Sequence, residues 1–369
     1  MFNPLSPQHV GDAAANVYDI LTGRGLADLR PTPRVIVAEE RQRTVYRYLP
    51  ADARPASELP TLFVPPLAAS TDCFDLHRRV SLAGHLLAEG HATYLLDYGE
   101  IGFSERDLGL EHWIDEVLPA AVQDVIDDAG VPAVQLVGWS LGGILALLAV
   151  AAHQELAVQT VTVVGSPFDV RNIPLAKWLT PVLDPGDGVV GTAIYRTMGT
   201  VPAPIVKRVF QLTSWDRYVT KPVAMAVKLH DREALAQMEA VDHFIDNMIG
   251  YPGRSVAQLY HRALRYGELA EGRITLGGRV IDLAEVRQPV LAFGSDADVL
   301  APAPVVFHVA DLLTGSQEVR LRKVPGGHLG MLAGRSAVGT TWVELDRFLR
   351  DFGTPPARLS PGDAVPASD

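Results

Sequence analysis

Short, continuous apolar runs alternate with segments of helical periodicity, and this alternation limits the possible folds more than any other feature of the chain. The apolar runs cover residues 61–64, 93–96, 134–137, 161–164 and 290–293, and the sheet pattern is expected to continue at residues 319–324. Helical spacing covers residues 76–88, 112–129, 141–153 and 341–349, and residues 35–38 and 44–49 indicate an opening hairpin. Uninterrupted apolar strands are typical of sheets covered on both faces. The alternation therefore predicts an α/β fold with a mostly parallel sheet, flanked by helices and joined by right-handed crossovers.

The alternation stops between residue 167 and about residue 282, where helical and turn-rich sequence replaces the strands. We expect residues 1–167 and 283–352 to form one core, with residues 168–282 inserted as a large, mainly helical cap. Residues 353–369 are expected to be a disordered tail, because they hold four prolines and almost no large apolar residues. The cap should cover the carboxyl ends of the strands, where open α/β sheets bind ligands.

Composition excludes several classes of function. We expect no nucleic-acid partner, because the net charge is -11 and the sequence has no basic stripe that would bind a phosphate backbone. A single cysteine, Cys73, excludes a disulfide framework and a multi-cysteine metal site, and no metal or cofactor motif is present. The longest strongly apolar stretch, residues 144–152, is too short for a transmembrane segment. We therefore expect a cytoplasmic protein that needs no cofactor and no metal, with a homo-oligomer left open.

One motif carries a specific chemistry. Residues 138–142 read Gly-Trp-Ser-Leu-Gly, between an apolar strand and a helix that starts near Leu141. This G-x-S-x-G element in a strand–turn–helix setting is typical of a nucleophile elbow, in which a tight turn exposes the hydroxyl of Ser140. The alternative is an ordinary glycine-rich turn in which the serine caps the helix.

A serine hydroxyl needs a base, and the base needs an orienting carboxylate. We expect His328 to be the base, because it follows a late strand and has glycines on both sides. The loop after residues 290–293 holds Asp296 and Asp298, and we favour Asp298 as the carboxylate while Asp296 stays open. A surface position in a loop is the alternative for His328. The order Ser140, Asp298, His328 is that of α/β-hydrolases.

An oxyanion hole needs two N–H donors. The N–H of Leu141, directly after the nucleophile, is one candidate. The second should come from the loop after residues 61–64, where Leu67 carries the first N–H because Pro65 and Pro66 have none. A plain proline turn is the alternative interpretation of this loop.

With these residues identified, the chain resembles the polyhydroxyalkanoate synthase group of α/β-hydrolases, above all the catalytic subunit of the class III enzymes. The resemblance is carried by residues 64–66, 104–110, 112–116, 138–143, 246–247, 251–253, 267–269, 278–283 and 327–330. It implies an α/β-hydrolase fold and acyl-transfer chemistry on a hydroxyacyl thioester. The family uses a cysteine nucleophile, and this chain has Ser140 at that position.

The change of nucleophile points to a different reaction. A thiolate is the better nucleophile and leaving group for repeated thioester exchange, whereas serine with histidine and aspartate more commonly hydrolyses esters and thioesters. We therefore predict an acyl hydrolase or acyltransferase that acts through a covalent acyl-enzyme. The alternatives are a polymer synthase that uses serine and a non-catalytic subunit that binds a synthase.

The substrate is expected to be a small acyl ester or acyl-CoA. We expect Trp139, next to the nucleophile, and Asp246, in the cap, to bind it, although Asp246 suits an ion pair at the base of the cap equally well. Several cap aromatics would line an acyl tunnel or, as we favour for each one separately, form the core of the cap: Trp178, Phe210, Trp215, Tyr218, Phe244 and Tyr251. The pair Lys207-Arg208 is a candidate for binding CoA phosphates.

Overall fold

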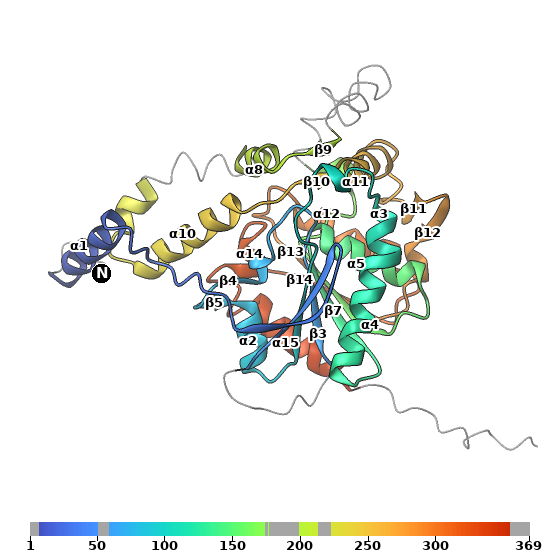
Figure 1. The fold of residues 1–369 in the computed structure, drawn as a ribbon, viewed down its shortest axis with the longest axis horizontal. Coiled ribbons are helices and arrows are strands. Elements are labelled where there is room, and N and C mark those ends of the chain that lie inside the picture. The colour runs from blue at the N-terminus through green and yellow to red at the C-terminus, as the bar shows by residue number, and fades with distance from the viewer. Residues whose placement is uncertain (1–6, 51–58, 174–175, 177–198, 213–222, 355–369) are drawn as a thin grey trace, which may run out of the picture.

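The fold is built on one large, mostly parallel sheet (Figure 1). The computed structural model describes residues 7–50, 59–173, 176, 199–212 and 223–354. Its eight strands lie in the order β1-β2-β6-β3-β7-β8-β13-β14, with antiparallel pairing only from β1 to β6. Their bounds are β1 Arg34–Glu40, β2 Arg43–Tyr48, β3 Thr61–Val64, β6 Thr93–Asp97, β7 Val134–Trp139, β8 Val158–Val164, β13 Val290–Gly294 and β14 Val319–Lys323. The predicted α/β fold is confirmed.

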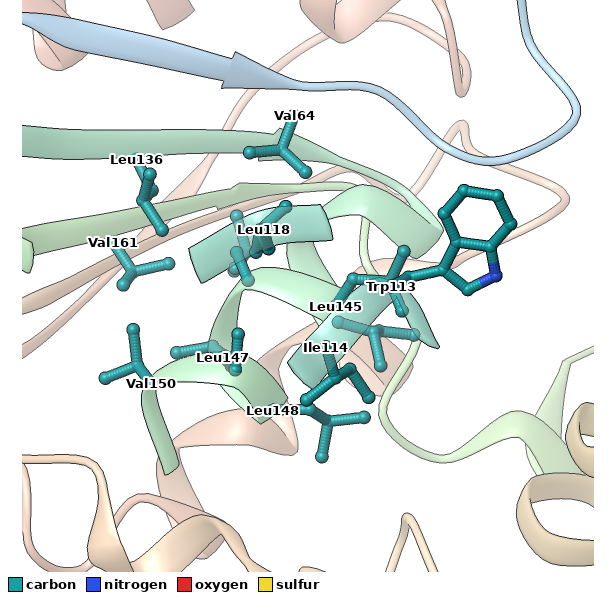
Figure 2. Packing of buried hydrophobic residues seen from close by; sticks show 14 of the residues in the cluster. Val64, Trp113, Ile114, Leu118, Leu136, Leu145, Leu147, Leu148, Val150 and Val161 are labelled. Atoms are coloured by element: carbon teal, nitrogen blue, oxygen red, sulfur yellow. The ribbon is translucent and has the colours of Figure 1, made fainter. Parts of the chain in front are cut away.

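Helices cover both faces of this sheet because successive strand residues point to opposite sides. On one face, Leu62 of β3 and Leu136 of β7 belong to a core shared with α4 (Leu118–Ala129) and α5 (Leu141–Ala152). Figure 2 shows this packing, with α5 against the strands. On the other face, Phe63 and Val137 pack with α2 (Leu82–Ala88) and α15 (Thr341–Asp351). Helix α5 is buried along almost its whole length, as its continuously apolar sequence requires.

Two expected helices differ from the structure. Residues 76–88 were expected to form one helix, but β4 (Asp75–His77) and β5 (Val80–Ser81) come first and α2 begins only at Leu82. Ser81 starts the helix, because its side chain accepts the N–H of Gly84. The expected helix 112–129 is divided into α3 (Leu110–His112), a π-helical segment (Trp113–Val117) and α4, which ends at left-handed Gly130 as predicted.

Other elements connect these layers. Short helices and turns lie at Thr71–Phe74, Phe103–Glu105, Val170–Asn172, Leu283–Glu285, α12 (Ala303–Phe307), α13 (Val309–Leu312) and α14 (Gly330–Ala333). The expected tail lies outside the described residues from residue 355 on. No described helix is both long and apolar enough to cross a membrane.

The inserted segment contains more than helices. It includes β9 (Thr200–Val201), α8 (Ala203–Leu212), α10 (Arg232–Asp246), β10 (Tyr251–Pro252), α11 (Gly253–Gln258) and a π-helical segment, Leu259–Arg265. It also includes the hairpin of β11 (Arg273–Leu276) and β12 (Arg279–Asp282), which packs against α5.

An N-terminal helix, α1 (Pro7–Leu21), was not expected from the sequence. It lies beside the start of α10, on an arm that projects away from the sheet (Figure 1). Asn16 Nδ2 donates to the carbonyl oxygen of Leu229 at 2.8 Å, and Arg232 pairs with Asp19 at 2.6 Å. The N-terminal helix thus packs on the inserted segment and not on the sheet.

Candidate active site

Ser140 lies on a strained turn between β7 and α5. Its backbone has φ 54° and ψ -123°, a region that residues other than glycine rarely adopt. The N–H of Ser140 donates to the carbonyl oxygen of Val164 on the neighbouring strand β8 at 2.8 Å. This bond fixes the turn to the sheet, so the side chain stands at the carboxyl edge of the strands.

The glycines around the serine allow this close packing. A Cβ atom on Gly142 would lie 2.1 Å from the carbonyl oxygen of Val64, and one on Gly138 would lie 2.5 Å from the Cα of Gly143. A Cβ on Gly143 would lie 2.2 Å from Ser166 Oγ. Each distance is far below van der Waals contact, so the motif needs glycine at all three positions.

Ser140, His328 and Asp298 form one hydrogen-bonded chain. His328 Nε2 lies 2.9 Å from Ser140 Oγ, and His328 Nδ1 lies 2.7 Å from Asp298 Oδ2. The three residues follow β7, β14 and β13, whose parallel strands end at the same edge of the sheet. The His328 side chain is 8% exposed and the Asp298 side chain is 0% exposed. The arrangement can remove the proton of the serine hydroxyl in a site that is nearly closed to water.

Asp298 is held as a carboxylate. Its Oδ1 accepts the N–H groups of Leu300 at 2.8 Å and Ala301 at 3.0 Å. Burial raises the pKa of Asp298, but the charge and hydrogen bond of His328 and the two N–H groups outweigh burial, so the net pKa is lowered. Asp296, the alternative left open by the sequence, points away and pairs with Lys323 at 2.8 Å.

The imidazole ring is positioned from several sides. The indole Nε1 of Trp139 donates to the backbone carbonyl oxygen of His328 at 3.1 Å. The two rings lie 5.1 Å apart between centroids. Gly165, with φ 59°, passes so close that a Cβ there would lie 3.3 Å from the imidazole. The histidine loop is therefore fixed by the residue that precedes the serine.

The two N–H groups expected to form the oxyanion hole belong to segments that lie close together beside Ser140. Leu141 is the first residue of α5, and Leu67 follows the two prolines after β3. Within the described ranges, neither N–H donates to a backbone carbonyl oxygen. The close contact of Gly142 with Val64 and Pro65 brings the two segments together. Unpaired N–H groups at a helix N-terminus are suited to stabilising developing negative charge.

A largely apolar cavity of about 440 Å³ opens onto Ser140 and His328. Its walls come from the β3 loop, the residues after β8 and the inserted segment. The lining comprises Pro66, Ala68, Ala69, Trp139, Ser140, Pro167, Val170, Ile173, Ala176, Val201, Val206, Val209, Phe210, Met248, Tyr251, Val256, Leu259, Leu264, Leu300, Ala301 and His328. Such a cavity suits the hydrocarbon part of an acyl group.

The expected substrate-binding residues separate into two groups. Trp139 lines the cavity, although its indole N–H already donates to the backbone carbonyl oxygen of His328. Asp246 does not line it: its side chain is 61% exposed and pairs with Lys207 across α8 and α10. The structure thus favours the ion-pair alternative for Asp246 and commits Lys207 to that pair.

Among the cap aromatics, Phe210 and Tyr251 line the cavity and Phe244 is buried behind Trp139. Trp178, Trp215 and Tyr218 lie outside the described residues. Val256, Leu259 and Leu264 also line the cavity but were not singled out. In the sequence these residues show apolar helical spacing, which indicates a helix face packed in the core as well as it indicates a cavity wall.

No metal site accompanies this arrangement in the described ranges, where no cluster of three His, Cys, Asp or Glu side chains is placed to hold an ion.

Comparison with known proteins agrees with the fold. The profile of the family described as alpha/beta hydrolase fold matches residues 62–187. Poly(3-hydroxyalkanoate) polymerase subunit PhaC of Haloarcula marismortui is 24% identical over 89% of this chain and 69% of its own length. PhaC of Allochromatium vinosum is 27% identical over 88% of this chain and 90% of its own length.

A solved structure shows the same architecture. Mouse alpha/beta hydrolase domain-containing protein 10 is 15% identical and superimposes with a TM-score of 0.50, covering 86% of this chain and 99% of its own. The likeness at this identity concerns the fold alone. Together these comparisons lead to one conclusion: the chain has an α/β-hydrolase fold and is similar in sequence to PhaC.

Proposed function

We propose that the protein is a serine-dependent acyl hydrolase or acyltransferase whose substrate is a small acyl or hydroxyacyl ester or thioester. The observation that carries the proposal is the continuous hydrogen-bonded chain from Ser140 Oγ to His328 Nε2 at 2.9 Å and from His328 Nδ1 to Asp298 at 2.7 Å. These three side chains are the nucleophile, the general base and the carboxylate that orients the base.

In the first half of the reaction, His328 takes the proton of the Ser140 hydroxyl as Oγ attacks the acyl carbonyl carbon. The oxyanion that forms accepts hydrogen bonds from the N–H groups of Leu141 and Leu67. Collapse of this intermediate breaks the bond to the leaving alcohol or thiol, and His328 returns the proton to that group. Asp298 stays ionised and stabilises the imidazolium. The product of this half is an acyl ester of Ser140.

In the second half, a water molecule or an acceptor alcohol attacks the acyl ester. His328 removes its proton, the N–H groups again stabilise the oxyanion, and the Ser140 oxygen leaves and recovers a proton. Water gives hydrolysis, and an alcohol gives acyl transfer. The apolar cavity of about 440 Å³ accommodates the acyl chain in both cases.

A poly(3-hydroxyalkanoate) polymerase is the second candidate, favoured by the PhaC relatives. In that reaction the acceptor is the hydroxyl end of a growing chain, and the acyl-enzyme must be passed on before water reaches it. Because the resembling family uses cysteine and an oxygen ester is a less activated acyl donor than a thioester, Ser140 favours hydrolysis or single transfer. A non-catalytic subunit is the least supported alternative, because it would not need the buried hydrogen-bonded chain.

The test compares wild type and Ser140→Ala on p-nitrophenyl esters and acyl-CoA thioesters of increasing chain length. We expect turnover by wild type and a loss of about 10³-fold or more in Ser140→Ala. Products from hydroxyacyl-CoA are analysed by mass. Free hydroxy acid or a single transfer product would support the proposal. Long polymer made processively would support the second candidate, the polymerase, instead. Equal turnover by Ser140→Ala would remove the nucleophile assignment.

A further inference from the structure

The loop that carries Leu67 has few backbone groups with which to hold its own position. Pro65 and Pro66 have no N–H, so this part of the loop can hydrogen bond to its surroundings only through its carbonyl oxygens. The carbonyl oxygen of Pro66 accepts the N–H of Ala69 at 3.2 Å, which closes a turn around Leu67. This bond lies within the loop, so it does not fix the loop relative to Ser140.

In the described ranges, two hydrogen bonds tie this loop to other elements, one on each side of Leu67. After Leu67, the carbonyl oxygen of Ala68 accepts the N–H of Ile249 at 3.1 Å. Before it, the carbonyl oxygen of Pro65 accepts the hydroxyl of Tyr98 at 3.1 Å. Tyr98 comes directly after β6, the strand that pairs with β3, so its side chain reaches the loop from the neighbouring strand.

The carbonyl oxygen of Pro65 lies where the loop meets the start of α5. A Cβ on Gly142 would lie only 2.8 Å from this oxygen. The phenol of Tyr98 therefore holds the loop at its contact with the helix whose first residue is Leu141. The relative position of the N–H groups of Leu141 and Leu67 depends on this contact.

The phenol itself is held firmly. Tyr98 is 1% exposed, and its ring meets the indole of Trp113 edge-on with 5.1 Å between the centroids. Trp113, which Figure 2 shows in the core beside α5, donates its indole N–H to Ser255 Oγ at 3.2 Å, and Ser255 donates to the carbonyl oxygen of Leu108 at 2.8 Å. Burial raises the pKa of Tyr98, so its hydroxyl stays protonated and remains a donor.

The phenol contacts the loop and not the cavity. Neither Tyr98 nor Pro65 is among the described residues that line the cavity over Ser140. An acyl chain in that cavity would contact Pro66 and Ala68 of the same loop instead. Removing the hydroxyl of Tyr98 should therefore leave the apolar walls in place and change only how firmly the loop is held.

We propose that Tyr98 is a positioning residue: by holding the carbonyl oxygen of Pro65, it keeps the N–H of Leu67 in place beside that of Leu141, so that both can bind the oxyanion. The proposal rests on the proposed function, because it takes these two N–H groups as the oxyanion donors. Without the phenol hydroxyl, the loop keeps its turn and its bond to Ile249 but loses its bond beside α5. Stabilisation of the oxyanion then weakens, whereas binding of the substrate does not change.

Tyr98→Phe removes the hydroxyl, keeps the ring against Trp113 and tests this directly. On the best p-nitrophenyl ester, kcat should fall by about tenfold, which is less than the loss of about 10²- to 10³-fold that is typical when a whole donor is removed. KM should stay within about twofold of the wild-type value. A trifluoromethyl ketone adds to Ser140 Oγ and forms a bound oxyanion while His328 takes the proton. Its dissociation constant should rise by about tenfold in Tyr98→Phe, in parallel with the fall in kcat.

Tyr94→Phe is the matched control. Tyr94 lies on β6, is also 1% exposed, and its hydroxyl donates to Asp128 Oδ2 at 2.7 Å. Asp128 lies near the end of α4, which leads into the start of β7, whereas Ser140 follows the end of β7. Each variant loses one buried hydrogen bond, so both should unfold at a lower urea concentration than wild type. Tyr94→Phe should nevertheless keep kcat and the dissociation constant of the ketone within about twofold of wild type.

Three results would overturn the proposal. The first is a wild-type kcat and a wild-type dissociation constant in Tyr98→Phe. The second is an equal loss in Tyr94→Phe, because the loss would then follow stability. The third is a raised KM with unchanged kcat, which would indicate weaker substrate binding.

Calorimetry with the ketone decides the case in which no ester turns over, and it also separates this proposal from the proposed function. If Ser140→Ala binds the ketone as tightly as wild type, the proposed function fails. If Ser140→Ala loses this binding and Tyr98→Phe keeps the wild-type dissociation constant, only the role of Tyr98 fails.

Discussion

Gly142→Ala tests whether α5 and the β3 loop together form an oxyanion-binding site. The added Cβ would lie 2.1 Å from the carbonyl oxygen of Val64 and 2.8 Å from the carbonyl carbon of Pro65. Both are backbone atoms and cannot rotate away. Real Cβ contacts essentially never fall below 3.0 Å, so the start of α5 and the loop must separate by about 0.9 Å. The two expected donors, the N–H groups of Leu141 and Leu67, lie on these two segments.

The magnitude follows from this displacement. Loss of one oxyanion donor typically lowers kcat by about 10²- to 10³-fold, and a misplacement of about 1 Å costs about 10²-fold. We therefore expect Gly142→Ala to lower kcat for ester hydrolysis by about 10²-fold. The same overpacking should lower the free energy of unfolding by about 1–3 kcal/mol, which leaves a folded protein to assay.

The assay measures kcat and KM on the best p-nitrophenyl ester, with circular dichroism and urea unfolding on the same samples. Gly339→Ala is the matched control, because a Cβ there meets nothing within 4 Å and its φ is not positive. It should match wild type in both measurements. Wild-type kcat in folded Gly142→Ala would refute the reasoning that these two segments supply the donors.

Three further predictions concern the neighbouring side chains. Asp298→Asn should lower kcat by about 10⁴-fold in steady-state assays, because the imidazole loses its orienting carboxylate. The pKa of Asp298 in the folded state is lowered below 3.8, so the ionised carboxylate stabilises the folded protein above that pH. In urea unfolding, the difference in free energy of unfolding between wild type and Asp298→Asn should become smaller as the pH falls below 3.8. Trp139→Phe should lower kcat by about tenfold with little change in KM, because it removes the hydrogen bond that holds the backbone carbonyl group of His328. A raised KM with unchanged kcat would instead indicate that Trp139 contacts the substrate. A double-mutant cycle on Lys207→Met and Asp246→Asn should give a coupling energy of about 0.2–1 kcal/mol in the free energy of unfolding and no change in ester hydrolysis. A change in KM would instead indicate that Asp246 contacts the substrate.

The sequence predicts the central strands well because β3, β6, β7, β8 and β13 are almost entirely buried and read as short, mainly apolar runs. Residues 61–64 were expected as a strand and form β3 with the same bounds. The elements that differ depend on distant contacts. Asp75 ends up in β4 because its carboxylate accepts the N–H and hydroxyl of Thr32, 43 residues away. No local periodicity carries that information.

The hairpin of β11 and β12 had a local signal that the sequence analysis did not use. Gly277 and Gly278 connect the two strands, with φ 57° and 84°. A two-residue Gly-Gly connection between two segments in which apolar and polar residues alternate is typical of a tight hairpin. The helix α1 also had a local signal that was not used, because Val10, Ala14, Val17 and Leu21 follow helical spacing. Its packing partner was not predictable locally, since Asp19 pairs with Arg232 of α10, more than two hundred residues along the chain.

The positions of the site residues could be expected from the motif and the chain order, but two choices could not. Asp296 and Asp298 lie in the same loop, and only the path of the backbone decides which carboxylate meets the imidazole. Tyr251 could be read as cap core or cavity wall, since its aromatic character suits both. Whether a side chain faces a cavity depends on the packing of several elements, which one sequence does not specify.

The central claim is that the hydroxyl of Ser140 is activated by His328 to become the nucleophile. The most direct measurement is reaction with a fluorophosphonate, followed by proteolysis and mass mapping of the adduct. The account predicts one adduct on Ser140, none in Ser140→Ala, and labelling slowed by about 10²- to 10⁴-fold in His328→Ala. An adduct on another residue, or wild-type labelling rates in either variant, would contradict it.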